Sequence, residues 1–292
     1  MRDTSSMRAT SSMVKAPGQP APSGRARPFP RLPRGPTMRP MEDPFVILIL
    51  TLASLAGATL SGFMGMGGGI LLLMIMFLAG LDPALVIPVH ALVQLASNGT
   101  RIIAYLSHVR WAPLGLFALC ALPFPALGLL IADLLDTEWT RVAVGLVAIT
   151  ATWFPATRGL GLSEKTTFAL LGAVVGTCGV VVGATGPLIA PFFLRGGWRK
   201  EQIIATKATC QAYNHLLKLA AFSLLAPTVT GSQSFAILDQ LVLAAPLLAA
   251  VVLGTFLGKR LLGHLSETRF RQLYRWLLTL IALRLLLTPL LG

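Results

Sequence analysis

The chain has 292 residues, of which 54% are hydrophobic and 12% are charged, and its formal net charge is +13 at pH 7. Several apolar runs approach the ~20 residues with which an α-helix crosses a bilayer, so the composition excludes an ordinary soluble protein and predicts an all-α polytopic membrane protein. The positive charge does not indicate nucleic-acid binding, because the basic residues lie in an N-terminal tail, in short loops and at a few positions within apolar segments. The three cysteines share no pairing or metal-ligand spacing, so we expect no metal or other cofactor.

Residues 1–40 differ from the rest of the chain because they are rich in Pro, Ser, Arg and Gly without apolar periodicity. Such a segment buries too little apolar surface to offset its ordering entropy, so we expect a disordered basic tail. Met1–Lys15 lack the apolar centre of a signal peptide. Two interpretations stay open: a cytoplasmic tail, or an upstream extension of a protein whose working start is Met38 or Met41.

Residues 41–155 are predicted to form a first transmembrane repeat. Its five apolar segments are about Pro44 to Ser61, Ile70 to Ala79, Pro83 to Ser107, Ala112 to Ala132 and Trp139 to Phe154. At ~1.5 Å per residue, the ten residues of the second segment cover only about half of a ~30 Å hydrocarbon core. We therefore expect this segment to be a half-helix that follows a glycine-rich break.

A linker at residues 156–163 precedes a second transmembrane repeat at residues 164–292. Its segments are about Thr167 to Val182, Leu188 to Leu194, Glu201 to Leu225, Phe235 to Phe256 and Phe270 to Leu291. Adding 117 to the residue numbers of the stretch from Ser61 to Arg101 superposes it on the second repeat without a gap, so that Gly62 falls on Gly179 and Gln94 on Gln211. Weaker matches continue at a shift of 130, which relates Leu135 to Leu265 and Arg141 to Arg271. This correspondence indicates an internal duplication.

The number of segments predicts how the two repeats are oriented. A unit that crosses the bilayer five times enters in the opposite sense when it is repeated, so the repeats are expected to have inverted topology. Loop charge agrees: with the linker in the cytoplasm, loops 108–110, 195–200 and 259–271 carry Lys and Arg on the inside, whereas loops 81–83, 133–138 and 226–234 carry none. The Arg-rich tail would lie outside, and this conflict favours the start at Met41.

The two glycine-rich breaks are candidate substrate-binding elements. Backbone groups freed by a break cannot face lipid, so the breaks must face protein or a water-filled cavity. The half-helix after each break directs its N-terminal N–H groups into the membrane, where they attract an anion, and paired breaks in inverted repeats are typical of a transporter site at the midplane. The alternative is glycine for close helix packing. The candidates are Gly67, Gly68, Gly69, Gly183, Thr185 and Gly186.

Each half-helix is followed by a segment with a stripe of polar residues. In the first repeat the offsets of 4, 7 and 11 residues from the first member, at ~100° per residue, keep the side chains within about 60° of one another. Cations inside a membrane are costly and usually face a cavity or a partner. One hypothesis is that a small anionic substrate neutralises these side chains. The alternative is a structural role, in which they extend to the membrane interface or bond backbone carbonyls. The stripes are His90, Gln94, Ser97 and Arg101, and Lys207, Gln211, Asn214 and Lys218, with Tyr213 and His215 beside the second.

These motifs resemble the sulfite exporter TauE/SafE family of membrane permeases. The first motif reads Gly62-x-x-Gly65-x-Gly67-Gly68-Gly69. The motif is followed by a short apolar segment, the Gly80-Leu81 turn and the polar-striped segment. The copy at residues 179–187 is similar to the family's second glycine motif. The likeness extends over about residues 44–291. The resemblance implies export of sulfur-containing or organic anions such as sulfite, sulfonates or sulfoacetate across a bacterial inner membrane.

The leading hypothesis is a secondary anion transporter with alternating access and no enzymatic activity. No glycine run is followed by the Gly-Lys-Ser/Thr of a nucleotide-binding P-loop, so no ATP-driven mechanism is encoded. A proton or sodium is the candidate coupling ion; His90 is either a proton carrier or a hydrogen-bonded neutral histidine. An anion channel, and an intramembrane enzyme using residues such as Cys210, stay open as alternatives, although no catalytic motif assigns roles to such residues. The expected partners are the lipid bilayer and the anion, and a homodimer is left open.

Overall fold

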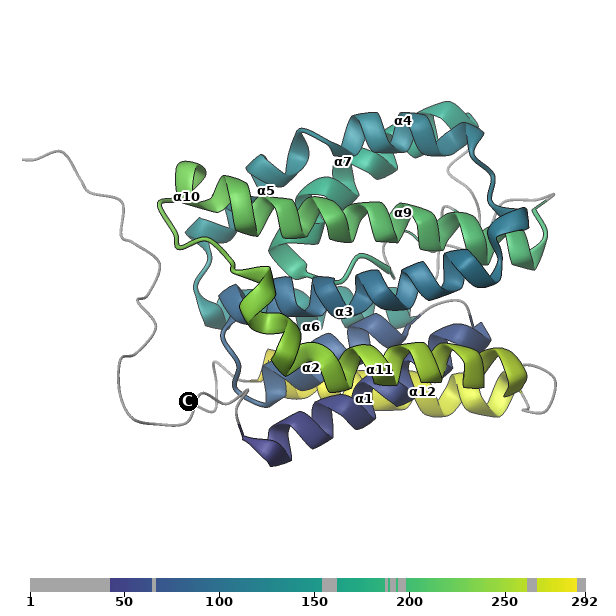
Figure 1. Cartoon of the computed structure of the whole chain (residues 1–292), viewed down its shortest axis with the longest axis horizontal. Helices are drawn as coiled ribbons and strands as arrows, with labels where there is room; N and C mark the ends of the chain where they lie inside the picture. Colours follow the sequence, from purple (N-terminus) through teal and green to yellow (C-terminus); the bar gives the residue numbers. More distant parts are fainter. Residues whose placement is uncertain are drawn as a thin grey trace, which may run out of the picture.

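The computed structural model describes residues 43–64, 67–153, 162–186, 189, 193, 198–261 and 267–287. Within these ranges all regular secondary structure is helical and no strand occurs, which confirms the predicted all-α class. The longer helices run side by side along one long direction of the molecule (Figure 1). The expected tail at residues 1–40 and most of the linker at 156–163 lie outside the described residues.

The first three helices agree with the predicted segments and include the short one. Helix α1 is Pro44–Met64, α2 is Gly68–Leu78 and α3 is Pro83–Ala104. Helix α2 has only 11 residues, and the chain leaves it through Gly80, whose φ of +78° is readily adopted only by glycine. Asp82 then caps α3, because its Oδ1 accepts the backbone N–H of Ala84 at 2.8 Å.

The segment predicted as one span at residues 112–132 consists of two helices, α4 (Ala112–Ala121) and α5 (Phe124–Leu134), bent by 46° at a short break. Pro123 and Pro125 flank the start of α5. A proline within a helix lacks an N–H donor and clashes with the preceding turn, which explains the bend. The predicted segment exists, but it is not straight.

The remaining helices follow the predicted order. They are α6 (Thr137–Trp153), α7 (Glu164–Val182), α9 (Lys200–Ala220), the π-helical segment η3 (Ala221–Leu225), α10 (Ala226–Val229), α11 (Ile237–Leu261) and α12 (Glu267–Leu286). The half-helix expected at 188–194 lies outside the described residues except for Ile189 and Phe193, both of which are helical.

The helices pack in pairs. Helix α1 packs against α11, α4 and α5 pack against α7, α3 packs against α9, and α6 packs against α12. Glycines allow several of these close approaches: a Cβ on Gly258 would overlap the carbonyl oxygen of Thr59 at the α1–α11 contact, and a Cβ on Gly172 would overlap that of Phe117 at the α4–α7 contact. Close packing therefore accounts for these glycines.

The exposed surface is apolar and much of the polar material is inside, as expected for a protein surrounded by lipid. Leucine and isoleucine side chains on several helices are largely exposed, among them Ile103 at 79% and Leu253 at 65%. By length and composition, α1, α7 and part of α11 can each cross a membrane, and α4 with α5 gives a fourth candidate if the bent pair is one span. The polar stripes lower the mean hydropathy of α3 and α9, and neither helix is among these candidates.

The two ends of the molecule differ in charge. Helices α3 and α11 end, and α9 begins, at the end on the right in Figure 1; nearby loops and helix ends carry Arg110, Arg199 and Lys259, and we call this the basic end. Helices α3 and α11 begin at the opposite end, where Asp82 caps α3 and Asp239 lies in the first turn of α11. We call this the acidic end.

Candidate functional site

The two polar stripes meet where α3 and α9 run side by side in opposite directions (Figure 1). The imidazole rings of His90 on α3 and His215 on α9 are 6.0 Å apart, centroid to centroid, and edge to face. Both rings are nearly inaccessible to solvent. The stripes therefore face each other across a shared interface instead of facing lipid.

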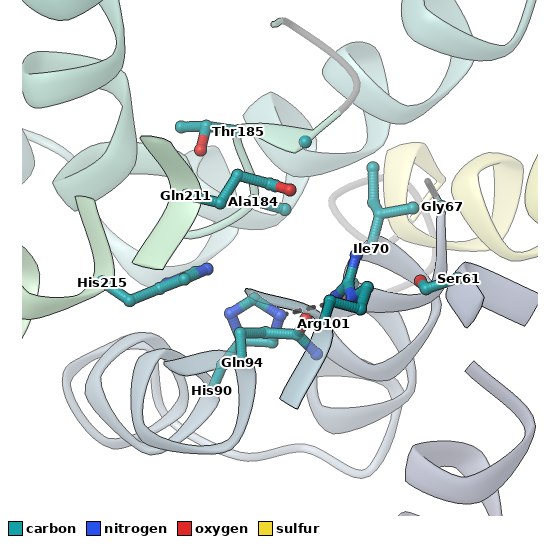
Figure 2. A pocket seen from close by; sticks show the side chains of 12 residues that line it. Ser61, Gly67, Ile70, His90, Gln94, Arg101, Ala184, Thr185, Gln211 and His215 are labelled. Atoms are coloured by element: carbon teal, nitrogen blue, oxygen red, sulfur yellow. Dashed lines mark hydrogen bonds between the residues drawn. The ribbon is translucent and has the colours of Figure 1, made fainter. Parts of the chain in front are cut away.

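A small polar cavity lies beside this interface, between the two breaks (Figure 2). The space available to the centre of a water molecule is ≈ 20 Å³, which suffices for about one water. Its lining combines helix α3, helix α9 and the residues that adjoin each break. The lining residues are Ser61, Gly67, Gly69, Ile70, His90, Gln94, Arg101, Ala184, Thr185, Gly186, Gln211 and His215.

Each break contains a glycine with a positive φ. Gly67, directly before α2, has φ +101°, and Gly183, directly after α7, has φ +80°. Side chains disfavour these conformations, so the chain can turn there at little cost only with glycine. Gly68 adds a close approach, because its N–H donates to Ser61 Oγ at 2.9 Å and a Cβ on it would overlap the carbonyl oxygen of Gly57.

A glutamine packs against each break in the same way. A Cβ on Gly69 would lie 2.9 Å from Oε1 of Gln94, and a Cβ on Gly186 would lie 2.9 Å from Nε2 of Gln211. The shift of 117 residues relates both the glycines and the glutamines. The absence of a side chain at each glycine therefore lets an amide that lines the cavity approach the start of the following segment.

His90 and Lys218 contact the backbone at the breaks. Nε2 of His90 lies 2.8 Å from the carbonyl oxygen of Gly69, and Nζ of Lys218 donates to the carbonyl oxygen of Gly183 at 2.6 Å. The two side chains come from different repeats and lie within electrostatic range of each other. We call them the carbonyl-bound pair, because each contacts a backbone carbonyl oxygen at one of the breaks.

Arg101 and Lys207 form a second pair, which the shift of 117 residues relates to Lys218 and His90 respectively. Arg101 donates through Nε to the carbonyl oxygen of Ser97 at 3.3 Å and through a terminal nitrogen to Ser97 Oγ at 3.1 Å, within its own helix. Nζ of Lys207 has no hydrogen-bond partner among the described residues, although the side chain is only 1% exposed. The two cations interact electrostatically, and we call them the solvent-excluded pair.

The site has an excess of buried positive charge. Three cationic side chains, those of Arg101, Lys207 and Lys218, are each at most 3% exposed, and the buried residues of the described chain include no Asp or Glu. Uncompensated buried charge is strongly unfavourable. The arrangement therefore suits a bound anion that neutralises part of this charge. Within the described ranges, no group of three His, Cys, Asp or Glu side chains is placed to hold a metal ion.

Comparison with known families identifies the chain's relatives. The family model described as Sulfite exporter TauE/SafE matches residues 49–285. The chain belongs to the sulfite exporter TauE/SafE family. Membership confirms the resemblance, and with the apolar helices it makes this a multi-pass membrane protein of an exporter family, which is consistent with transport and not catalysis. The comparisons with curated proteins and with solved structures found no match.

In this TauE/SafE protein the structure brings together most of the candidate residues. Six of the sequence candidates do not line the cavity, and their contacts explain why: Lys218 bonds Gly183, Ser97 holds Arg101, and Nδ2 of Asn214 donates to Thr185 Oγ1 at 3.1 Å. The candidates in the lining are Gly67, Gly69, His90, Gln94, Arg101, Thr185, Gly186 and Gln211; those outside it are Gly68, Ser97, Gly183, Lys207, Asn214 and Lys218.

Four lining residues are absent from the sequence candidates: Ser61, Ile70, Ala184 and His215. Ser61 lies on α1 and accepts the N–H of Gly68 at the first break, Ala184 belongs to the second break, and His215 lies one residue after Asn214 of the stripe. The position of His215, eight residues after Lys207, places it about 80° from Lys207 around the helix. A wider angular window around the stripe would have included it.

Proposed function

We propose that this protein is a secondary transporter that exports small sulfur-containing or organic anions, such as sulfite, sulfonates or sulfoacetate, across a bacterial inner membrane. The observation that carries the proposal is the polar cavity lined by Arg101, two histidines and two glutamine amides, with no carboxylate among its lining residues. Guanidinium and amide N–H groups are donors suited to sulfonate and sulfite oxygens. The anion would enter a site where binding removes unfavourable positive charge.

The duplication supports alternating access by two inverted repeats. The shift of 117 residues carries α3 onto α9, and these helices lie side by side in opposite directions (Figure 1). The helix contacts are paired in a similar way: α1 of the first repeat packs on α11 of the second, and α7 of the second repeat packs on α4 of the first. The α3–α9 and α6–α12 contacts each join one repeat to the other. Such a quasi-symmetric frame can expose one central site to either side by a rocking motion.

Charge supports an orientation with the basic end in the cytoplasm. The loops and helix ends that carry Arg110, Arg199 and Lys259 meet at that end, and Asp82 and Asp239 lie at the other. Lys and Arg are enriched in cytoplasmic loops. Export then moves the anion from the basic end to the acidic end, with a proton or a sodium ion as the coupling ion and His90 and His215 as the groups available to carry a proton.

Sulfite binding and sulfite movement test the proposal together. The purified protein should melt at a higher temperature when sulfite is added, because a ligand that binds only the folded state stabilises it by mass action, while sodium chloride at equal ionic strength should leave the melting temperature unchanged. Reconstituted protein should exchange labelled sulfite between the two sides of a vesicle. No melting shift and no exchange with sulfite, sulfoacetate or an alkylsulfonate would contradict the proposal.

A transporter and a channel differ in one measurement. A transporter loaded with unlabelled sulfite should accumulate labelled sulfite transiently above its equilibrium level, because a carrier exchanges one anion for another. A channel would only equilibrate the label. Proton coupling would make accumulation depend on an imposed pH gradient, and sodium coupling would make it depend on a sodium gradient at constant pH.

A further inference from the structure

A second and larger cavity lies at the acidic end of α3. Its volume is ≈ 300 Å³. The first turns of α3, the α5–α6 connection, the end of α7 and the π-helical segment η3 all contribute to its walls. The residues that bear on the argument are Asp82, Ile87, Asp136, Glu138, Val181 and Phe222.

Helix α3 connects this cavity with the polar one. Ile87 lines the larger cavity and His90 lines the polar cavity, and two residues three positions apart lie on the same face of a helix, about one turn from each other. The larger cavity therefore lies on the extension of the polar cavity toward the acidic end.

Aliphatic side chains pack against the second break between residues that line the two cavities. Ile87 is only 2% exposed. A Cβ on Gly183 would lie 3.4 Å from Cγ1 of Ile87 and 3.2 Å from Cδ1 of Leu73, so both side chains rest against the backbone of the second break. Ala184, the next residue, lines the polar cavity. Ile87 and Leu73 therefore contact the residue that directly precedes a lining residue of the polar cavity.

The two cavities have opposite charge. Arg101 lines the polar cavity without any carboxylate, whereas Asp82, Asp136 and Glu138 line the larger cavity without any Lys or Arg. Two of these carboxylates are held in place, because Asp82 Oδ1 accepts the N–H of Ala84 at 2.8 Å and Asp136 Oδ1 accepts that of Trp139 at 2.9 Å. An anion is attracted to the first cavity and repelled from the second.

We propose that the larger cavity is the exit vestibule of the transport pathway and that Ile87, packed with Leu73 against Gly183, is the gate between the vestibule and the anion site. This inference rests on the proposed function. Once Ile87 moves aside, the carboxylates disfavour residence of the anion in the vestibule, so the anion leaves for bulk solvent and rebinds from that side only at higher concentration. The carboxylates lower the apparent affinity for the anion at the acidic end only. They do not alter the equilibrium distribution of the anion between the two sides of the membrane.

The gate can be tested by accessibility, without any transported substrate. In a background with Cys120, Cys178 and Cys210 replaced by alanine, Ala184→Cys serves as a reporter in the polar cavity. A membrane-impermeant methanethiosulfonate reagent is applied from the acidic end. Ile87→Ala should raise the labelling rate at least tenfold, and Ile87→Val, which removes one methylene group and keeps more of the packing, should raise it less.

Ile103→Ala is the matched control, because Ile103 lies on the same helix but is 79% exposed. It should leave the labelling rate unchanged. Equal rates for the Ile87 and Ile103 variants, at equal amounts of folded protein, would overturn the assignment of the gate. This result would leave sulfite binding by the native protein unaffected, so the failure of the gate and the failure of the proposed function are distinguishable.

The vestibule charge is tested with sulfite and Glu138→Gln, which removes one carboxylate that lines the cavity. The sulfite concentration for half-maximal exchange should fall about threefold at the acidic end and stay constant at the basic end. Asp133→Asn is the control, because Asp133 lies in the last turn of α5 but not in the lining. An equal change at both ends, or no change, would overturn the vestibule.

Discussion

The carbonyl-bound pair and the solvent-excluded pair occupy equivalent places in the duplicated sequence but have different partners. His90 and Lys218 contact carbonyl oxygens of Gly69 and Gly183, whereas Lys207 has no hydrogen-bond partner among the described residues and Arg101 bonds only Ser97 of its own helix. A hydrogen bond to a break stabilises the backbone there. A buried cation without such a bond stays available to a ligand. The two pairs are related by the shift of 117 residues, and their different partners lead us to expect that one pair supports the backbone and the other binds charge.

The largest effect on binding is expected from the solvent-excluded pair. Arg101→Gln should weaken sulfite binding roughly 10- to 100-fold, because Arg101 lines the cavity and a hydrogen bond to a charged group contributes about 1.5–3 kcal/mol. Lys207 lies outside the lining, so Lys207→Gln should weaken binding through the loss of buried positive charge beside Arg101. Calorimetric titration of sulfite into folded, monodisperse protein measures this effect. Lys259→Gln is the control, since Lys259 lies near the basic end over the ring of Tyr105 and should bind sulfite with unchanged affinity.

Lys218→Gln should behave differently, although duplication alone predicts that Lys218 and Arg101 are equivalent. The shorter neutral side chain loses the 2.6 Å bond to the Gly183 carbonyl and leaves a buried acceptor unsatisfied, which costs about 1–3 kcal/mol of folding stability. The yield of folded protein should fall, while affinity per folded molecule should change less than in Lys207→Gln. A larger loss of affinity in Lys218→Gln than in Lys207→Gln would reverse the roles assigned to the two pairs.

The glycines offer a matched comparison of the two breaks. Gly69→Ala and Gly186→Ala should both fold, because the new methyl group meets the movable end of a glutamine at 2.9 Å, but displacement of the amide from the cavity should weaken sulfite binding by roughly 3- to 10-fold, or about 1 kcal/mol. Gly68→Ala should instead prevent folding, because its methyl group meets the backbone of Gly57.

Removal of the displaced amide sharpens this test. The double substitution Gly69→Ala with Gln94→Ala relieves the clash without restoring the amide, so its affinity should equal that of Gln94→Ala alone. Native affinity in Gln94→Ala alone would show that Gln94 does not contact the anion.

Residue patterns predicted the helices more completely than they predicted the contacts of the site. Apolar length and the glycine cluster were enough to predict that α2 is short, because helix length and backbone freedom are local properties. The bend at Leu122 was missed, although Pro123 and Pro125 are visible in the sequence, because the apolar run continues through them. The π-helical segment after Lys218 has no comparable signal in the sequence; within it the carbonyl oxygen of Phe222 accepts the N–H of Phe235 at 3.1 Å, a contact between residues 13 positions apart.

The candidate site was predictable as a set of residues but not as a set of roles. Helical spacing placed His90, Gln94 and Arg101 on one face, and the structure places all three in the lining. Spacing within one helix cannot show that Lys218 extends to Gly183, 35 residues earlier in the chain. Such contacts depend on how α7 and α9 approach each other, which the one-dimensional pattern does not contain.

The smallest effect is expected at Thr185, whose counterpart in the first half of the chain is a glycine. The shift of 117 residues relates Thr185 to Gly68, and only the second break therefore offers a hydroxyl, which accepts a hydrogen bond from Asn214 at 3.1 Å. Thr185→Val keeps the shape of the side chain and removes this acceptor, so the folded state should lose about 1 kcal/mol through the unsatisfied amide of Asn214.

Thermal unfolding in detergent, with and without sulfite, measures this loss. Asn214→Ala serves as the matched variant: if the hydroxyl–amide bond is the relevant interaction, Thr185→Val in the Asn214→Ala background should cost less than Thr185→Val alone, because the two sites are coupled. The melting-temperature gain from sulfite should stay nearly the same in both variants, since the cations remain. A loss of the sulfite effect in Thr185→Val would instead show that the hydroxyl contacts the anion, and the second break would then contribute a side chain to the site that the first break lacks.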